Sequence, residues 1–463
     1  MTEMKPGLCV LITNAFIKYW SGSELYVRDV AMELIKRSHK PVVYSPRIGK
    51  LADEFRIKSI PVVSDLNSLG VRPDLIHGQH HLETMTALAH FPDTPAVYFC
   101  HGWLPWEETP PLHPRILRYV TVSDALHDRL IYEIGIPAEK VTTILNSVNL
   151  ERFRPRPPLP THPKRALVFH SRATEANLLG IIQEACARSN IDVDAIGYNT
   201  DNATESPETL LGNYDIIFGV GRSALEGLAT GTAVVCCGLE GAGPMVTTQN
   251  LPWLRSNNFG IRILDRPLTP EILSAEINRY DPLDARKVSE GVRAAAGLDS
   301  MVDQVLGVYS STLDDWGKNL PRDSRAESMA FSAYLQGISG KFDLAMSERA
   351  LANIQVGSLQ RELSNLQTEL SSLKAELGNT RNELANNRNE LNNARSELGN
   401  ARSELGNARN ELGNARSELT DIQGRLTWRL YYRLTHISFI RNIYGMLASS
   451  IRRRRPQTKD ERK

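Results

Sequence analysis

The stretch Tyr214–Val235, YDIIFGVGRSALEGLATGTAVV, decides the fold. An apolar run leads into a turn that contains Gly219 and Gly221, a helical pattern follows until Gly231, and a second apolar run comes next. This order predicts a strand–turn–helix–strand unit. Glycines in such a turn let the backbone approach a ligand, and the unpaired N–H groups of the first helical turn favour an anion.

Glu226 lies about one turn into the predicted helix. Its carboxylate could accept hydrogen bonds from the two hydroxyl groups of a ribose, so a nucleoside diphosphate would suit the turn and the glutamate together. A purely structural interpretation is equally open. Gly-rich strand-to-helix turns occur throughout α/β proteins, and a glutamate early in a helix often only complements the helix dipole.

Composition describes an ordinary globular chain with an appendage. The 463 residues suffice for two domains and more, and the net charge of +1 gives no general reason to expect nucleic-acid binding. MTEMKPG at the start is not followed by a long apolar segment, so we expect neither a secretory signal nor a membrane-spanning helix. Five dispersed cysteines without metal-ligand spacing indicate core positions in a reducing compartment: Cys9, Cys100, Cys186, Cys236 and Cys237.

Short apolar runs alternate with helical patterns from Leu8 to about Tyr309, which predicts an α/β fold with doubly wound parallel sheets. The proline-rich segment Arg156–Pro163 divides this region. We therefore expect two Rossmann-like domains, at residues 1–155 and 156–309. Such sheets bind ligands beyond the carboxyl ends of their strands, which is where the sequence places the Gly22–Ser23 loop and His101. A single histidine there is more often structural than catalytic.

The order of these features resembles the two-domain GT-B glycosyltransferases of the retaining family four. The resemblance covers roughly the first 310 residues and is most specific between Ser123 and Pro155. The segments that carry it are GSELYVRDVAMELIKRSHKPVVYSP (Gly22–Pro46), VYFCHG (Val97–Gly102), TVSDALHDRLIYEIGIPAEKVTTILNSVNLERFRP (Thr121–Pro155), HSR (His170–Arg172) and FGVGRSALEGLATGTAVV (Phe218–Val235).

The resemblance implies a nucleotide-sugar donor between the two domains and sugar transfer without a metal or a permanently bound cofactor. Glu226 matches the glutamate that binds the donor ribose, and Arg172 matches the arginine that neutralises the departing diphosphate. His101 matches the histidine close to the reacting sugar. The implied donor-binding set also includes the loop and turn residues Gly22, Ser23, Gly221, Arg222 and Ser223.

Three positions depart from the family pattern. Phe218 replaces a first glutamate, Asn177 and Leu178 stand where a lysine is usual, and NSVN at Asn146–Asn149 replaces NGVD. We expect Arg222, at the helix start, to supply the missing positive charge. The alternative is that these departures make the two glycosyltransferase-like domains catalytically inactive.

Composition changes after residue 309. Residues 310–355 are predicted to be a connector with a loose polar start and short helices, and residues 356–425 follow a seven-residue repeat with leucine at position a and glutamate at position g. This period predicts a left-handed coiled coil, and g-to-e pairs such as Glu397 with Arg402 favour a parallel homodimer. Small alanines at position d and glycines in the repeat weaken the coiled coil, so a single solvated helix is the alternative.

Residues 426–463 form a basic amphipathic tail. Between Arg425 and Lys463 there are eleven Lys or Arg residues against two Asp or Glu. Apolar and aromatic residues at helical spacing next to this charge favour an anionic membrane surface, although nucleic acid or a partner helix is also compatible.

Two functions are consistent with all of this. The first is a cytoplasmic glycosyltransferase, peripherally bound to the membrane, that acts on a lipid-linked or polysaccharide acceptor. In it, the coiled coil at 356–425 separates the two α/β domains from the membrane-bound tail at 426–463. The second is a non-enzymatic assembly protein with a glycosyltransferase-like head and a coiled-coil scaffold.

Overall fold

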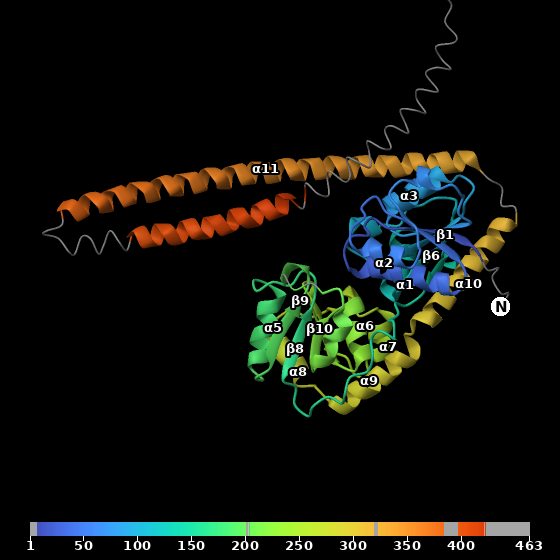
Figure 1. Ribbon diagram of the computed structural model, residues 1–463, viewed down its shortest axis with the longest axis horizontal. Helices are drawn as coiled ribbons and strands as arrows, with labels where there is room; N and C mark the ends of the chain where they lie inside the picture. The colour runs from blue at the N-terminus through green and yellow to red at the C-terminus, as the bar shows by residue number, and fades with distance from the viewer. Residues whose placement is uncertain are drawn as a thin grey trace, which may run out of the picture. The chain divides into compact units, whose positions relative to one another are not determined.

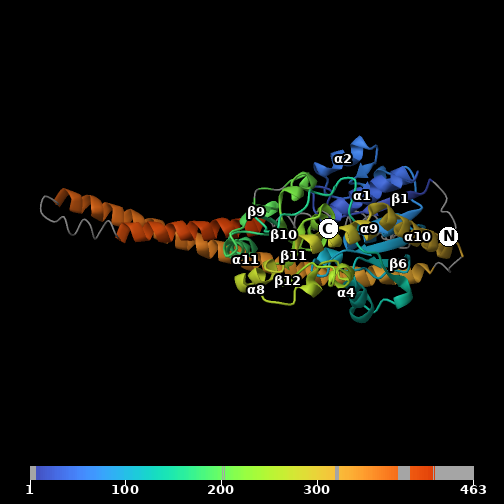
Figure 2. The ribbon, with the colours of Figure 1, turned by 90° about the horizontal axis from the view of Figure 1, so that it is seen from below.

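The computed structural model describes residues 7–200, 202, 204–318, 323–383, 397–420 and 422. The chain divides into a compact unit, Met1–Phe331, and a second unit, Ser332–Lys463. The first unit contains two α/β domains, each built on a largely parallel sheet, which appear as the blue and the green regions of Figures 1 and 2. The predicted fold class is confirmed.

The N-terminal domain is a seven-stranded sheet in the order β3-β2-β1-β4-β5-β6-β7, and every neighbouring pair is parallel. Buried apolar residues fill its strands because helices cover the sheet. The strands are β1 (Cys9–Thr13), β2 (Lys40–Tyr44), β3 (Val62–Val63), β4 (Leu75–Gly78), β5 (Ala96–Cys100), β6 (Ile116–Thr121) and β7 (Val141–Thr143). The helices are α1 (Gly22–Lys36), α2 (Leu51–Ile57), α3 (His81–His90) and α4 (Asp124–Asp128).

The second sheet has five strands in the order β12-β11-β10-β8-β9. Its edge strand β12 (Gly241–Met245) is antiparallel to β11 (Ala233–Gly238), a strand that the sequence pattern does not reveal because it contains only small residues and a proline before Met245. The other strands are β8 (Arg165–Phe169), β9 (Asp192–Ile196) and β10 (Ile216–Gly219). The helices are α5 (Leu178–Ala187), α6 (Gly221–Thr230), α7 (Leu251–Ser256), α8 (Pro270–Ile277) and α9 (Pro282–Ala295).

Helix α10 (Leu298–Gly317) returns the chain to the N-terminal domain, as the yellow helix of Figure 1 shows. Met301, Val302 and Val305 lie in the same buried cluster as strands β1, β4 and β5. The predicted loose polar start of the connector at residue 310 is therefore wrong as far as residue 317. The amphipathic pattern of α10 continues through that boundary, and its apolar face packs on the first sheet rather than the second.

Helix α11 (Ser324–Glu383) is one continuous element of 60 residues rather than the predicted short helices followed by a separate repeat. Residues 397–420 are also helical. In this region the buried leucines Leu370, Leu405 and Leu412 all occupy the predicted position a. The basic tail at 426–463 lies outside the described residues.

Two further sequence predictions can be compared with the fold. Four of the five cysteines are buried core residues, whereas Cys9 is half-buried at the start of β1. Among the helices of the described ranges, none combines the length and the apolar character needed to cross a bilayer.

Candidate functional site

The turn between β10 and α6 is built as the sequence predicts. Gly221 has a φ of +56°, in the left-handed region where a side chain is strained, and it starts the helix. Ser223 closes the turn on itself, since its hydroxyl donates to the Val220 carbonyl at 2.9 Å and accepts from the Val220 amide at 3.2 Å. Gly221 therefore supplies the left-handed backbone conformation of the turn, and Ser223 supplies the hydrogen bonds that close it.

Glu226 and Arg222 lie together on α6. The Arg222 guanidinium donates to the Glu226 carboxylate at 2.6 Å, and the same guanidinium donates to Asp29 of the N-terminal domain at 2.6 Å. Glu226 is only 2% exposed. Two predicted site residues are thus in contact with each other, and Asp29, which no sequence motif singled out, joins them.

Burial and charge act in opposite directions on this cluster. Burial raises the pKa of Glu226, and the charge of Arg222 offsets part of that shift. Burial alone would lower the pKa of Arg222, but Asp29 and Glu226 outweigh it and raise that pKa. Asp29 also accepts a hydrogen bond from Arg28, and despite burial the two arginines hold its pKa below the usual value.

Arg172 follows β8 and is the exposed cation of the predicted set. Its side chain is 58% exposed and pairs with Glu240, which follows β11, at 2.7 Å. An exposed pair of this kind is worth only about 0–1 kcal/mol, so a bound anion can replace the carboxylate at little cost. Arg172 is therefore more available to a ligand than Arg222, which is 16% exposed and paired with two carboxylates.

His101 follows β5, as predicted, and its ring packs on Tyr26 of α1 with a centroid distance of 4.3 Å. Burial lowers the pKa of His101 to about 4, so the ring is neutral near pH 7. Its Nε2 atom is buried and has no hydrogen-bond partner within the described part of the chain. A neutral ring with one unused nitrogen suits a hydrogen bond to a ligand.

A buried carboxylate that the sequence reasoning missed fixes the backbone of His101. Glu108 accepts from the His101 amide at 2.9 Å and lies 3.6 Å from Nε2 of His80. His80, which follows β4, has a φ of +58° and accepts a hydrogen bond from the Ala15 amide through Nδ1 at 2.9 Å. His80 is not a predicted site residue, because only its positive φ and the nearby carboxylate distinguish it, and the sequence shows neither.

The Gly22–Ser23 loop begins α1. Gly22 is exposed, and a side chain there would meet no other atom within 4 Å, so packing does not require a glycine. The Ser23 hydroxyl donates to the buried Glu24 carboxylate at 3.2 Å. The structure therefore leaves the Gly22 backbone open at the start of a long helix.

Two of the three departures from the family pattern have structural explanations. Phe218 is fully buried in the core of β10, in a place where a charged side chain would be desolvated. Asn177 caps α5, because its side-chain oxygen accepts from the amides of Leu178 at 2.6 Å and Thr174 at 2.7 Å. Both residues serve the fold in place of the family's charged groups.

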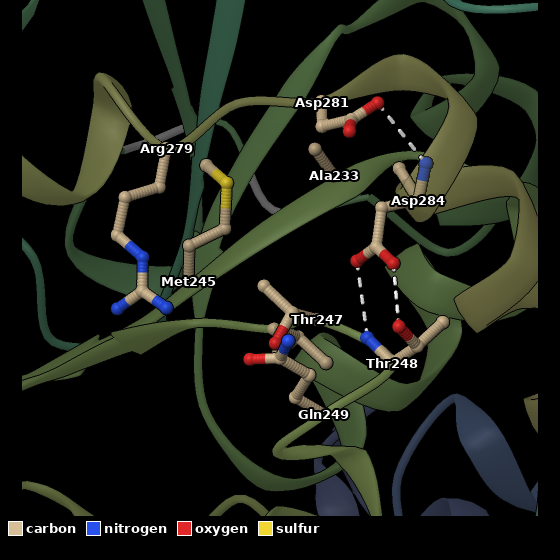
Figure 3. Close-up of a pocket in the computed structure, with 10 residues that line it drawn as sticks. Ala233, Met245, Thr247, Thr248, Gln249, Arg279, Asp281 and Asp284 are labelled. Carbon is tan, nitrogen blue, oxygen red and sulfur yellow. Dashed lines mark hydrogen bonds between the residues drawn. The ribbon is translucent and has the colours of Figure 1, made fainter.

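The pocket in Figure 3 lies elsewhere. It has a volume of 240 Å³ and is lined by Ala233 at the start of β11 and by Met245 at the end of the antiparallel β12. Asp284 accepts hydrogen bonds there from the amide and hydroxyl of Thr248, at 3.0 and 2.6 Å. Ala233 lies at the amino end of β11, whereas the β10–α6 turn lies at the carboxyl end of the parallel strand β10. The pocket is therefore separate from the predicted site.

Comparisons with known proteins concern the fold and the N-terminal domain. Residues 20–152 match the Glycosyltransferase Family 4 family. Two solved structures are similar in fold: a glycosyltransferase from Rickettsia africae ESF-5, and the Anabaena protein HepE in complex with UDP and glucose. Each is 16% identical to this chain, with a TM-score of 0.50, and each match covers 66% of this chain. The match covers 99% of the Rickettsia chain and 100% of the Anabaena chain.

No sequence among the curated proteins matches the chain. The chain thus matches the Glycosyltransferase Family 4 model over residues 20–152, in a fold like that of the GT-B glycosyltransferases.

Proposed function

We propose that this protein is a glycosyltransferase that transfers a sugar from a nucleotide-sugar donor. The observation that carries the proposal is the buried Glu226 carboxylate on α6, directly behind a glycine turn and in contact with the N-terminal domain through Arg222. The family match at residues 20–152 and the GT-B-like fold support the same activity.

Each predicted residue has a role that its surroundings support. Glu226 accepts hydrogen bonds from the donor ribose, and Arg172 leaves Glu240 to neutralise the diphosphate as charge builds on it. His101, neutral and with Nε2 unused by the described residues, donates to or accepts from the reacting sugar. The Gly22–Ser23 loop and the turn at Gly221 bring backbone amides to the diphosphate. Transfer proceeds with retention and without a metal.

Release of nucleoside diphosphate tests this proposal. The full chain is incubated with UDP-, GDP-, dTDP- and ADP-linked sugars, with water as the only acceptor, so that hydrolysis of the donor yields free sugar and nucleoside diphosphate, and the diphosphate is quantified. We expect release from one donor class, loss of release in Glu226→Ala and retention of release in the control Asp284→Ala, which changes a residue of α9 in the separate pocket beside Ala233 and Met245. The absence of release from every donor would contradict the proposal.

The acceptor is proposed to be lipid-linked or a polysaccharide, at the cytoplasmic face of a membrane. The support is the basic amphipathic sequence at 426–463, whose arginines would add about 1 kcal/mol each near an anionic surface. Flotation of the full chain and of a chain ending at residue 425 with liposomes of anionic lipid tests this. Equal flotation of the two chains would defeat the membrane role.

A parallel homodimer through residues 356–425 is proposed from the charge pattern, in which each position g is glutamate. The competing arrangement covers the position-a leucines within one chain, which the burial of Leu370, Leu405 and Leu412 supports. Analytical ultracentrifugation of the full chain separates the two. A monomer at all concentrations would remove the dimer.

An inactive, scaffold-like head is the second candidate function. The buried Phe218 and the capping Asn177, which replace charged residues of the family pattern, favour it. This candidate predicts nucleotide binding without diphosphate release, whereas the transferase predicts both.

A further inference from the structure

Four charged side chains of alternating sign form a continuous buried chain across the two domains. Arg28 donates to Asp29 on α1 at 2.8 Å, Asp29 accepts from Arg222 at 2.6 Å, and Arg222 donates to Glu226 at 2.6 Å. The side chains of Arg28, Asp29 and Glu226 are 5%, 7% and 3% exposed, and Arg222 is 16% exposed. Buried ion pairs are costly to separate because each partner would be left without solvent.

We propose that Asp29 is a positioning residue of the donor site: it holds the Arg222 guanidinium, and Arg222 in turn fixes the Glu226 carboxylate in the orientation that receives the ribose. The N-terminal domain thereby orders a donor-binding group of the C-terminal domain, and the site is complete only when the two domains are in contact. This inference rests on the proposed function, and it assigns to that site a residue to which the family resemblance gave no role.

The geometry gives Arg222 this organising role rather than direct contact with a diphosphate. Two of the Arg222 nitrogens, Nε and Nη2, are already bound to the Glu226 and Asp29 carboxylates, so a bidentate grip on a phosphate would break at least one of these pairs and leave a buried carboxylate without its cation. Arg172, by contrast, has one exposed partner. The expectation from the sequence that Arg222 replaces the missing lysine is thus the less favourable use of this side chain, and Arg172 is the cation free to exchange partners.

The pH dependence of nucleotide binding distinguishes this role from simple structural support. Within the described part of the chain, the charges that act on the pKa of Glu226 belong to Arg222 on its own helix, Asp29 on α1, and Arg152, which precedes β8. Asp29 raises the pKa of Glu226, and both arginines lower it. Because ribose hydroxyls bind the ionised carboxylate, binding is lost as the pH falls through the pKa of Glu226. We call this fall of affinity at low pH the acid limb. Removing Asp29 should move the acid limb to lower pH, and removing Arg222 should move it to higher pH.

The test is titration calorimetry of the full chain with UDP, GDP, dTDP and ADP from pH 4 to 8. For Asp29→Asn we expect affinity for the bound nucleotide to fall about tenfold at pH 7, with the acid limb at lower pH than in the wild type. For Arg222→Met we expect a comparable loss with the limb at higher pH. The double variant should lose no more than Arg222→Met, because Asp29 acts through Arg222.

Asp128→Asn is the matched control. Asp128 of α4 pairs at 2.7 Å with Arg262 of the C-terminal domain, but this interdomain pair is 44% and 38% exposed and touches no predicted site residue. Its loss should leave affinity and the acid limb unchanged. Circular dichroism of every variant establishes folding, and hydrogen–deuterium exchange of α1 and α6 without nucleotide measures the domain contact by itself.

The outcomes separate the inference from the proposed function. If the wild type binds a nucleotide and Asp29→Asn binds it equally with the same acid limb, the positioning role is overturned and the proposed function stands. If the wild type binds none of the four nucleotides, the proposed function fails and the positioning role fails with it. Faster exchange of α1 and α6 in Asp29→Asn, but not in Asp128→Asn, would then support only the interdomain contact.

Discussion

The phenol hydroxyl of Tyr309 on α10 is hydrogen-bonded to Nδ1 of His77 on β4, 232 residues earlier in the chain. Both side chains are fully buried, and the His77 ring stacks on Phe99 with a centroid distance of 3.7 Å. The helix that follows the C-terminal domain is therefore an integral part of the core of the N-terminal domain. Folding of the first domain is coupled to residues beyond the second.

Tyr309→Phe should destabilise the protein by about 1–3 kcal/mol, because it leaves a buried nitrogen of His77 without its partner. Urea unfolding followed by circular dichroism measures the change. The control is Tyr132→Phe, at a side chain that is 84% exposed, where the change should stay within about 0.5 kcal/mol. Equal effects of the two substitutions would show that the buried hydrogen bond contributes nothing.

Arg115→Met should be more damaging, by about 3–5 kcal/mol. Arg115 is 2% exposed, and it donates to the carbonyls of Phe91 and Thr94 and to the carboxylate of Glu327 at 2.9 Å, on the first turns of α11. Denaturant unfolding compares it with Arg56→Met, which removes an exposed pair with Asp53 and should cost less than about 1 kcal/mol. A small loss in Arg115→Met would mean that α11 is not anchored here.

Stability should fall in mild acid because of His113. Burial, with Arg115 nearby, lowers the pKa of His113 to about 3, and its Nδ1 accepts from the Arg115 amide at 3.2 Å. The unfolded histidine has a pKa of about 6.5, so between pH 7 and pH 5 the unfolded chain takes up a proton that the folded protein does not. This contribution is present above the unfolded pKa and is lost as the pH falls, by roughly 2 kcal/mol over that interval.

Unfolding free energies at pH 7 and pH 5 check this for the wild type and His113→Asn. Asparagine keeps an acceptor near the Arg115 amide but does not titrate, so the variant should lose less stability between the two pH values. The other buried histidines, including His101, contribute equally to both proteins. Identical pH dependence in the two would contradict a buried, neutral His113.

Local sequence signals predicted local structure well. The two apolar runs within Tyr214–Val235 form β10 and β11, and the helical pattern between them forms α6. Gly231 ends α6 with a φ of +88°, as its position after the helical pattern predicted. Periodicity, capping and glycine placement act over a few residues, which is why one sequence suffices to find them.

Relationships over long range could not be predicted in this way. The return of α10 to the first sheet depends on which of two apolar surfaces its own face fits, and periodicity does not tell them apart. The contact of Asp29 with Arg222 depends on the placement of two domains, and an aspartate in an amphipathic helix looks like an ordinary exposed charge. Glu226 was predicted from its turn, but its partner across the domains was not.

Direct binding of nucleoside diphosphates to Glu226 variants tests the central claim. UDP, GDP, dTDP and ADP are titrated into the full chain, Glu226→Ala and the control Asp284→Ala. The account predicts that one nucleotide binds the wild type and the control alike, and that Glu226→Ala binds it at least about tenfold more weakly, because charged hydrogen bonds to the ribose are lost. Equal affinity of Glu226→Ala and the wild type would contradict it.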